Sequence, residues 1–328
     1  MSKATTDISE SKQKRHVRFH QPGVLYHVVS KTIRGEFLLT PKKGVADLCA
    51  GVVAQAQSHW PTVKLYGFAC LSNHIHLQLA AGTYYDISYF VGFIKREISR
   101  RLGKKYDLPG TFWHGPFTST ALPTPESQEE CLAYILSQGV KENLVGHPCN
   151  WPGLHCAKAL LKGQAVEGRW FNATKYKIAE RNQERSKKQV KVHKRDYYDE
   201  LTIVMSPIPA WEHLTQHQRQ QRANKLVEII VKEASSKRHE TGNKVLGKKK
   251  VIQMPLFTRV LPPKPPWWKE RRRQLTAWAR LGDRLTKEYV ALYWAFQEAF
   301  RNASDCLKQN EKTHFPEGSW IPAHPCPT

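Results

Sequence analysis

The stretch VKLYGFACLSNHIHLQL, residues 63–79, contains two runs rich in aromatic and branched apolar residues on either side of Ser72-Asn73. Runs of this kind favour strands, and a Ser-Asn pair favours a turn, so the stretch predicts a β-hairpin. Side chains alternate between the two faces of a strand. Ile75, Leu77 and Leu79 therefore share one apolar face of the second strand, which we expect to face the core.

The opposite face of the same strand carries His74, His76 and Gln78. Two histidines two residues apart lie about 7 Å apart at their Cα atoms, which is close enough for both rings to bind one metal ion. A second interpretation is that one or both histidines only line the polar face of a sheet. The spacing alone leaves both interpretations open.

The neighbouring segments predict an α+β fold built around this hairpin. A strand is expected at 25–30, a helix from 41 to about 59, a helix through 87–102 and a strand near 117–122. Ser127-Gln128-Glu129-Glu130 resembles a capping box, so another helix is expected to begin there. The order β-α-β-β-α-β-α predicts a ferredoxin-like antiparallel sheet with one extra helix.

That last helix is expected to carry Tyr134 and Gln138 on one face, because residues four apart are neighbours on a helix. The opposite, packing side is marked by four apolar residues, Leu132, Ile135, Leu136 and Val140. A buried tyrosine bonded to a glutamine is an ordinary structural feature. Taken alone, this pair therefore indicates no function.

Composition favours a nucleic-acid partner. The 328 residues include 51 basic and 28 acidic side chains, which give a formal net charge of +23. Such an excess is typical of proteins that meet a polyanion, either nucleic acid or an anionic membrane. No apolar run approaches the roughly 20 residues that cross a bilayer, and no signal peptide is recognisable. Seven irregularly spaced cysteines do not form a disulfide pattern, so we expect a cytoplasmic protein.

Four segments are expected along the chain. These are a basic N-terminal arm at 1–20, a catalytic domain at 21–157, a basic linker at 158–199 and a mostly helical C-terminal domain at 200–328. Between 158 and 195 the sequence has 12 basic and 3 acidic residues, which is typical of a linker or a surface arm. Loop interruptions are expected at 247–250 and 261–266. The strongest helical periodicity is carried by Leu275, Trp278, Leu281, Leu285, Tyr289, Leu292, Phe296 and Phe300.

One cysteine and histidine cluster could form a zinc site by residue type. It consists of His147, Cys149, His155 and Cys156. Its spacing matches none of the common zinc-finger patterns, which disfavours a zinc-organised DNA-binding module.

Taken together, the motifs resemble a known family, the single-tyrosine HUH transposases, and most closely the REP-associated tyrosine transposases. Residues 71–77, LSNHIHL, resemble the His-hydrophobic-His signature. Residues 134–145, YILSQGVKENLV, followed by Trp151-Pro152, resemble the tyrosine helix and the segment after it. Further similarities are found at Pro22-Gly23, Tyr26-His27-Val28, Phe112-Trp113 and Phe117. The resemblance covers about residues 16–155.

The resemblance implies an HUH nuclease-like fold in which His74, His76 and Gln138 bind a divalent metal ion and Tyr134 is the nucleophile. Many REP-associated members have Asn-Pro where this chain has Gln138-Gly139, which weakens assignment to that subgroup but not the ligand role. The implied partner is single-stranded DNA, as a hairpin or palindrome, and a homodimer is left open. The expected activity is that of a transposase-like endonuclease and strand transferase; a domesticated chromosomal copy is one hypothesis.

The chemistry is coherent on physical grounds. A free tyrosine has a pKa near 10, so catalysis needs a group that favours the phenolate and offsets phosphate charge. Two imidazoles and an amide are neutral, so a bound ion keeps its full charge as a Lewis acid. Imidazole ligands favour Mn²⁺ on softness grounds, whereas Mg²⁺ is more abundant, and either is expected to serve. Attack by Tyr134 would leave a 5′-phosphotyrosine and a free 3′-hydroxyl.

Two other functions remain as alternatives. One is a nucleic-acid-binding protein without cutting activity, which is supported by the basic excess and by Trp267-Trp268 beside Arg271-Arg272-Arg273. The other is a replication-initiator-type HUH endonuclease, although the sequence has no phosphate-binding Gly-Lys-Ser/Thr loop of the kind found in helicases. Candidate DNA contacts lie on the helix at 87–105, namely Arg96, Arg100, Arg101, Lys104 and Lys105. The basic tract at 158–195 is expected either to bind phosphates or to be a solvated surface.

Overall fold

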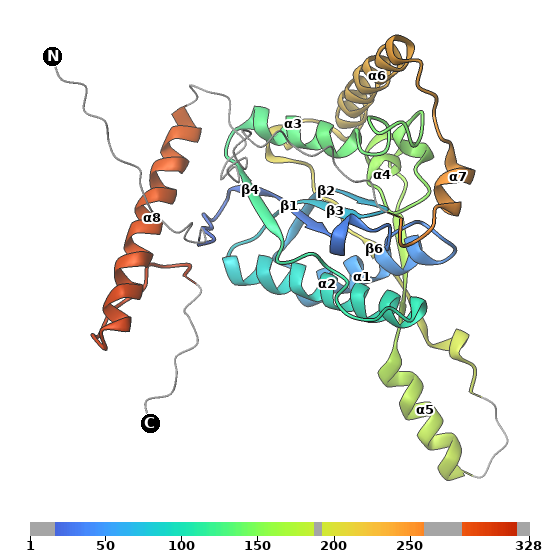
Figure 1. Ribbon diagram of the computed structural model, residues 1–328, viewed down its shortest axis with the longest axis horizontal. Coiled ribbons are helices and arrows are strands. Elements are labelled where there is room, and N and C mark those ends of the chain that lie inside the picture. The colour runs from blue at the N-terminus through green and yellow to red at the C-terminus, as the bar shows by residue number, and fades with distance from the viewer. Residues whose placement is uncertain (1–16, 187–191, 259–283, 320–328) are drawn as a thin grey trace.

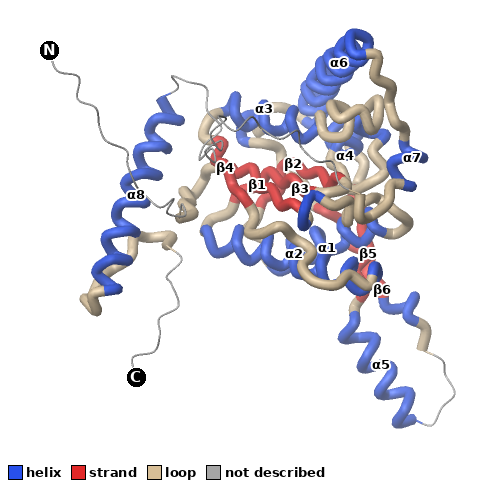
Figure 2. Tube along the Cα trace, in the orientation of Figure 1, coloured by secondary structure: helices blue, strands red, loops and turns tan. Residues whose placement is uncertain are grey.

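The computed structural model describes residues 17–186, 192–258 and 284–319. Its centre is a four-stranded antiparallel sheet in the order β2-β3-β1-β4 (Figure 2). The strands are β1 (Leu25–Lys31), β2 (Lys64–Leu71), β3 (His74–Ala80) and β4 (Thr118–Leu122). The β2–β3 hairpin turns at Ser72-Asn73 as predicted, with Phe68 opposite Leu77. The expected antiparallel sheet is therefore confirmed.

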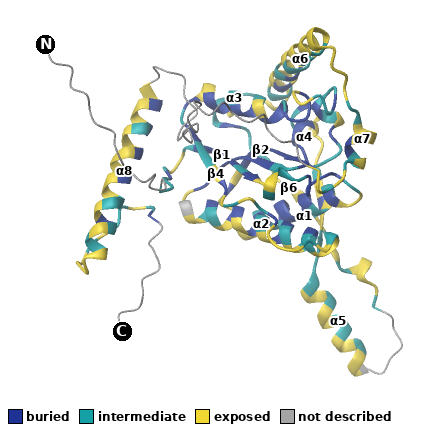
Figure 3. Cartoon of the chain, viewed as in Figure 1, coloured by how far each residue is buried: buried dark blue, intermediate teal, exposed yellow. Residues whose placement is uncertain are grey.

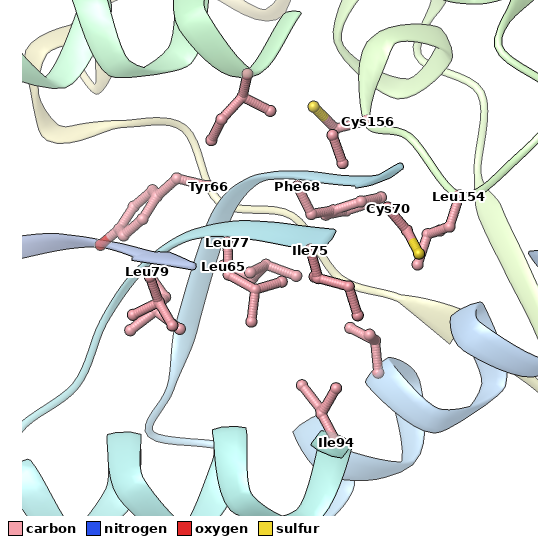
Figure 4. Close-up of a cluster of buried hydrophobic side chains, with 14 of the residues drawn as sticks. Leu65, Tyr66, Phe68, Cys70, Ile75, Leu77, Leu79, Ile94, Leu154 and Cys156 are labelled. Atoms are coloured by element: carbon pink, nitrogen blue, oxygen red, sulfur yellow. The ribbon is translucent and has the colours of Figure 1, made fainter. Parts of the chain in front are cut away.

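Helices cover both faces of the sheet. Helices α1 (Val45–His59) and α2 (Tyr84–Tyr106) lie on one face, and α3 (Pro125–Leu136) lies on the other (Figure 1). Ile75 and Leu79 point from β3 toward the layer that contains Ile94 of α2 (Figure 4). All three side chains are almost fully buried. The apolar face of β3 therefore faces the core, and the histidine face is turned toward α3.

Helix α3 begins and ends at different residues from those expected. Its N-cap is Thr124, whose side chain and that of Ser127 form a reciprocal capping box, and Pro125 occupies the first turn. The expected start at Ser127 was thus wrong by one turn, because Thr124-Pro125 provides the stronger start signal. The helix ends at Leu136, and Gly139 follows with a φ of 80°. Gln138 therefore lies just beyond the helix rather than on it.

The described residues from 157 to 186 and from 192 to 203 contain regular structure, although the sequence predicted a basic linker at 158–199. They contain α4 (Ala157–Lys162), β5 (Val166–Phe171), α5 (Ala173–Ser186) and β6 (Tyr198–Ile203). Strands β5 and β6 form an antiparallel pair that packs against α1. Trp170 of β5 stacks on Phe93, and the Arg101 guanidinium lies 3.8 Å from its ring centroid. Apolar and cation–π contacts thus hold in place a segment that was expected, from its basic charge, to be exposed to solvent.

The contact between α1 and β5 depends on two glycines. A Cβ atom at Gly168 would lie 2.1 Å from the backbone nitrogen of Gly51, which no side-chain movement can relieve. Gly168→Ala is therefore expected to lower the free energy of unfolding by about 3 kcal/mol, the upper part of the usual range for overpacking. Urea unfolding followed by circular dichroism would measure this.

The control for that prediction is Gly92→Ala in α2. A Cβ at Gly92 meets no atom within 4 Å, so alanine is expected to be neutral or to stabilise the helix by up to about 1 kcal/mol. Equal effects of the two substitutions would contradict the close packing of β5 on α1.

The C-terminal region is mostly helical, as expected. It contains α6 (Gln216–Thr241), α7 (Lys248–Gln253) and α8 (Arg284–Lys308), so the expected interruption at 247–250 is instead the start of α7. The remaining short elements are 3-10 helices, η1 (Ile33–Gly35), η2 (Pro148–Asn150), η3 (Lys194–Tyr197) and η4 (Pro209–Trp211). The predictions for Leu275, Trp278, Leu281, 261–266, Trp267-Trp268 and Arg271-Arg272-Arg273 lie outside the described residues.

Helix α8 holds the last residues of the expected N-terminal arm. The Phe19 ring lies 5.5 Å from that of Tyr289 and 5.1 Å from that of Phe296. Gln297 is fully buried and its amide bonds to both the backbone nitrogen and the carbonyl of Val17. The arm is therefore anchored from Val17 onward; residues 1–16 lie outside the described part. No helix in the described ranges is long and apolar enough to span a bilayer.

Candidate active site

The polar face of the sheet brings together three histidines. His74 and His76 lie on β3, and His27 lies on the adjacent strand β1, which pairs with β3. The rings of His27 and His76 are stacked with centroids 5.1 Å apart, and those of His74 and His76 are 4.6 Å apart. His27 was not predicted as part of the site. The alternation of buried Tyr26 and Val28 around it was the available signal.

Hydrogen bonds fix the tautomer of His74. Its Nδ1 lies 2.6 Å from Oδ1 of Asn73, and the amide nitrogen of Asn73 donates to the carbonyl of Gly35. The Asn73 oxygen is thereby oriented as the acceptor, so Nδ1 of His74 carries the proton. Nε2 of His74 is left with its lone pair directed away from the turn.

Gln138 presents a second lone pair to the same point. Its amide nitrogen donates to the carbonyl of Tyr134 at 3.1 Å, which fixes the orientation of the amide. Oε1 therefore faces Nε2 of His74 at 3.4 Å. Two acceptor atoms at this distance repel each other unless a cation or a proton lies between them. Gln138 is almost fully buried, so bulk water does not separate the pair.

His76 offers a third ligand atom. Its Nδ1 lies 2.9 Å from Nε2 of His27, which accounts for one ring nitrogen of each residue. Nε2 of His76 is buried and has no hydrogen-bond partner among the described residues. A buried polar atom without a partner is costly, and a metal ion would satisfy it. The donor set therefore fits a divalent cation.

Burial keeps the three imidazoles neutral. It lowers the pKa of His27 and of His74 to about 4 and that of His76 well below its usual value. The ammonium group of Lys141 adds to each decrease. Neutral imidazoles are the form that binds metals, so no proton has to be displaced at neutral pH.

Tyr134 lies at the open side of this cluster. Its side chain is 37% exposed, whereas His76 and Gln138 are buried, so a large substrate can reach the phenol. Its ring is nearly perpendicular to those of His76 and His27, with centroids at 5.5 and 5.8 Å. The Lys141 ammonium lies 3.5 Å from the ring centroid. The tyrosine thus contacts both imidazoles and a cation.

The comparisons with known proteins bear on this arrangement directly. The family model described as transposase IS200 like matches residues 21–138. This segment, which is about a third of the chain, is similar to the IS200-like transposase family. The resemblance inferred from the sequence is confirmed for this part of the chain, and the match ends at Gln138, the third candidate ligand.

Two solved structures are similar to the protein. One is a REP-associated tyrosine transposase bound to a REP hairpin, with 17% identity and a TM-score of 0.39, covering 45% of this chain and 86% of that one. The other is a putative transposase from Deinococcus radiodurans R1, with 19% identity and a TM-score of 0.27, covering 37% and 95%. No curated protein matches.

The basic residues predicted on α2 are not part of this cluster. Helix α2 lies on the opposite face of the four-stranded sheet from α3 (Figure 1). Glu97 binds Arg100 at 2.6 Å and Arg101 at 3.2 Å, and Arg96 lies 3.6 Å from the same carboxylate. The Lys105 ammonium donates to a backbone carbonyl, that of Lys43, and Lys104 is exposed. These contacts give Arg101 a packing role; DNA binding by this face stays a prediction.

The cluster of His147, Cys149, His155 and Cys156, which follows the segment matched by the family model, is not arranged as a metal site. Nδ1 of His147 and Nδ1 of His155 accept hydrogen bonds from the backbone nitrogens of Cys149 and Ala157. Within the described residues, no cluster of three or more His, Cys, Asp or Glu side chains is arranged to hold an ion. The three candidate ligands, His74, His76 and Gln138, include only two residues of these types, and the third histidine on this face, His27, bonds to His76.

Proposed function

We propose that the protein is a divalent-metal-dependent endonuclease and strand transferase that cuts single-stranded DNA through Tyr134. One observation carries the proposal. Three atoms that can each offer a lone pair, Nε2 of His74, Nε2 of His76 and Oε1 of Gln138, belong to one buried cluster beside a half-exposed tyrosine. This arrangement lies within the part of the chain that matches IS200-like transposases.

The two histidines and Gln138 would hold the ion. A bound Mg²⁺ or Mn²⁺ would supply Lewis-acid stabilisation of phosphate charge, because all three ligands are neutral. Asn73 fixes the tautomer of His74, and His27 bonds to the inner nitrogen of His76, so both residues orient ligands. The Lys141 ammonium lies 3.5 Å from the centroid of the Tyr134 ring, where its charge would attract the phosphate of a bound DNA strand.

In the proposed reaction, the Tyr134 hydroxyl oxygen attacks the phosphorus and loses its proton. The bond from phosphorus to the 3′-oxygen of the preceding nucleotide breaks, and this oxygen takes up a proton. The products are a 5′-phosphotyrosine and a free 3′-hydroxyl. Because the covalent link conserves the phosphodiester bond energy, a 3′-hydroxyl can attack it and rejoin strands. The same step makes both cleavage and strand transfer available to one site.

The proposed catalytic unit extends past the family match to about residue 157. After Gly139 the chain returns to the edge strand β2. There the backbone nitrogen of Cys70 donates to the carbonyl of Leu154, and the backbone nitrogen of Cys156 donates to the carbonyl of Phe68. The Trp151 indole also donates to the carbonyl of Cys70. Trp151 and Val145 lie close to Gly139, so this segment packs against the turn that follows α3.

Covalent trapping tests the proposal. The full-length protein would be incubated with a labelled single-stranded oligonucleotide pool of random sequence and Mn²⁺, then separated on a denaturing gel. We expect a protein band that carries label, and we expect none with the same pool as duplex or with excess chelator. Tight binding of the pool without any covalent band would instead support a nucleic-acid-binding protein that does not cut.

A further inference from the structure

One segment of the C-terminal region is bonded to loops beside the candidate site. Residues 243–258, which include α7 and are called the strap below, are attached at both ends by backbone hydrogen bonds. Leu246 and Gly247 donate to the carbonyls of Asn143 and Leu144, at 2.8 and 3.0 Å. At the other end, Phe37 donates to the carbonyl of Thr258 at 3.0 Å.

Both attachment points adjoin loops that position the candidate ligands. Asn143 follows Gln138 in the turn after α3, and this turn also carries Lys141. Phe37 follows Gly35, whose carbonyl accepts from Asn73, the residue that orients His74. The strap therefore joins the two loops on either side of the proposed metal ligands. Figure 1 shows α7 at the end of the sheet that is near α4, away from α8.

The strap is anchored on one side and exposed on the other. Val251 is fully buried, and Leu246 and Leu256 pack against the core. Its exposed residues include three consecutive lysines, Lys248 to Lys250, and Phe257, which is 58% exposed. Figure 3 shows α7 as partly exposed. Within the described part of the chain, none of these lysines forms an ion pair. The strap thus carries an exposed aromatic ring and unpaired cations on one segment, and this combination of residues binds single strands.

An open cleft of about 730 Å³ adjoins the same segment. Lys248 of the strap lines it together with Lys158 and Lys162 of α4, and the carboxylates of Asp47 and Glu167 line it as well. The three lysines extend the positive surface from the strap toward the β5–β6 unit. A phosphate backbone that passes along the strap therefore continues to meet cations.

We propose that the strap holds the single-stranded part of the DNA substrate next to the phosphate to be cut. This inference rests on the proposed function, which supplies the single strand. The lysines contact backbone phosphates and the Phe257 ring stacks on a base. Duplex DNA buries its base faces, so the stacking contact selects an unpaired segment.

Binding measurements on the full chain test the strap. The probe is a fluorescent oligothymidylate 20-mer, alone or annealed to oligodeoxyadenylate, followed by anisotropy over a range of salt concentrations. Replacing Lys248, Lys249 and Lys250 together with glutamine should lower the slope of log K against log salt by about 2, because each phosphate contact on a single strand contributes about 0.7. Phe257→Ala should weaken single-strand binding about tenfold, and Phe257→Trp should restore it.

A matched control removes the same charge elsewhere. Lys225, Lys232 and Lys237 are exposed on α6, and their combined replacement with glutamine should change the slope by much less than the strap variant does. Equal slopes for the two triple variants, or equal losses on single strands and duplex for Phe257→Ala, would overturn the inference. Covalent trapping by the wild type is measured in parallel. If the wild type is trapped but the two triple variants have equal slopes, only the DNA-binding role of the strap is refuted. If the wild type is not trapped, the proposed function is refuted, and the slopes still test whether the strap binds single strands.

Discussion

Tyr134→Phe is expected to bind single-stranded DNA with the affinity of the wild type and to form no covalent adduct. The substitution removes one hydroxyl from a side chain that is already half-exposed, so neither the core nor the ring contacts with His27 and His76 should change. No other group in the cluster can replace a phenol as the attacking oxygen. The loss should therefore be complete on a denaturing gel, whereas anisotropy should report unchanged binding.

Tyr89→Phe is the matched control for this variant. Tyr89 is also exposed, at 52%, but it lies on α2, in the layer on the opposite face of the sheet. This variant should trap as much DNA as the wild type. A labelled band that persists in Tyr134→Phe, or one that disappears in Tyr89→Phe, would show that Tyr134 is not the nucleophile.

His76→Ala and His74→Ala are each expected to reduce cleavage by about a thousandfold, because a lost ligand forfeits several kcal/mol of charge stabilisation. Single-turnover cleavage with Mn²⁺ would measure the rate. Titration of the protein with Mn²⁺, followed by electron paramagnetic resonance, would measure the loss of the ion independently of activity. Circular dichroism should confirm that the fold is kept.

The control substitution is His217→Ala, on the exposed surface of α6, which should leave both cleavage and Mn²⁺ binding unchanged. Chelator should abolish cleavage by the wild type, and added Mn²⁺ should restore it. Full cleavage by the wild type in excess chelator would rule out the metal-dependent mechanism, whatever the histidine variants do.

The sheet and the histidine pair could be predicted from the sequence because strand alternation is a local property. His74 and His76 had to share a face, and the apolar residues of that strand indicated that the other face packs against the core. Tyr134 and Gln138 lie near the histidines, but they are not on one continuous helix as expected. Gln138 lies in the turn after α3, where Gly139 reverses the chain, so their proximity does not come from a continuous helix.

The structure of the residues after 157 was less predictable, because their packing depends on contacts between residues that are far apart in the sequence. Strand β5 has an alternating set, Val166, Gly168 and Trp170, but the charged residues between them favoured an exposed tract. Its burial depends on Gly51 in α1, which lies more than a hundred residues earlier in the chain. Similarly, Tyr289 and Phe296 pack as the periodicity of α8 predicts, whereas Leu285 and Leu292 of the same set remain exposed.

The most direct test of the account is to locate the covalent bond. The full-length protein would be trapped with a single-stranded oligonucleotide pool and Mn²⁺, digested with protease and nuclease, and analysed by mass spectrometry. We expect a nucleotide linked through its 5′-phosphate to the peptide that contains Tyr134, and a free 3′-hydroxyl on the released strand. A linkage at another residue, or a 3′-phosphate joined to the protein, would contradict this expectation.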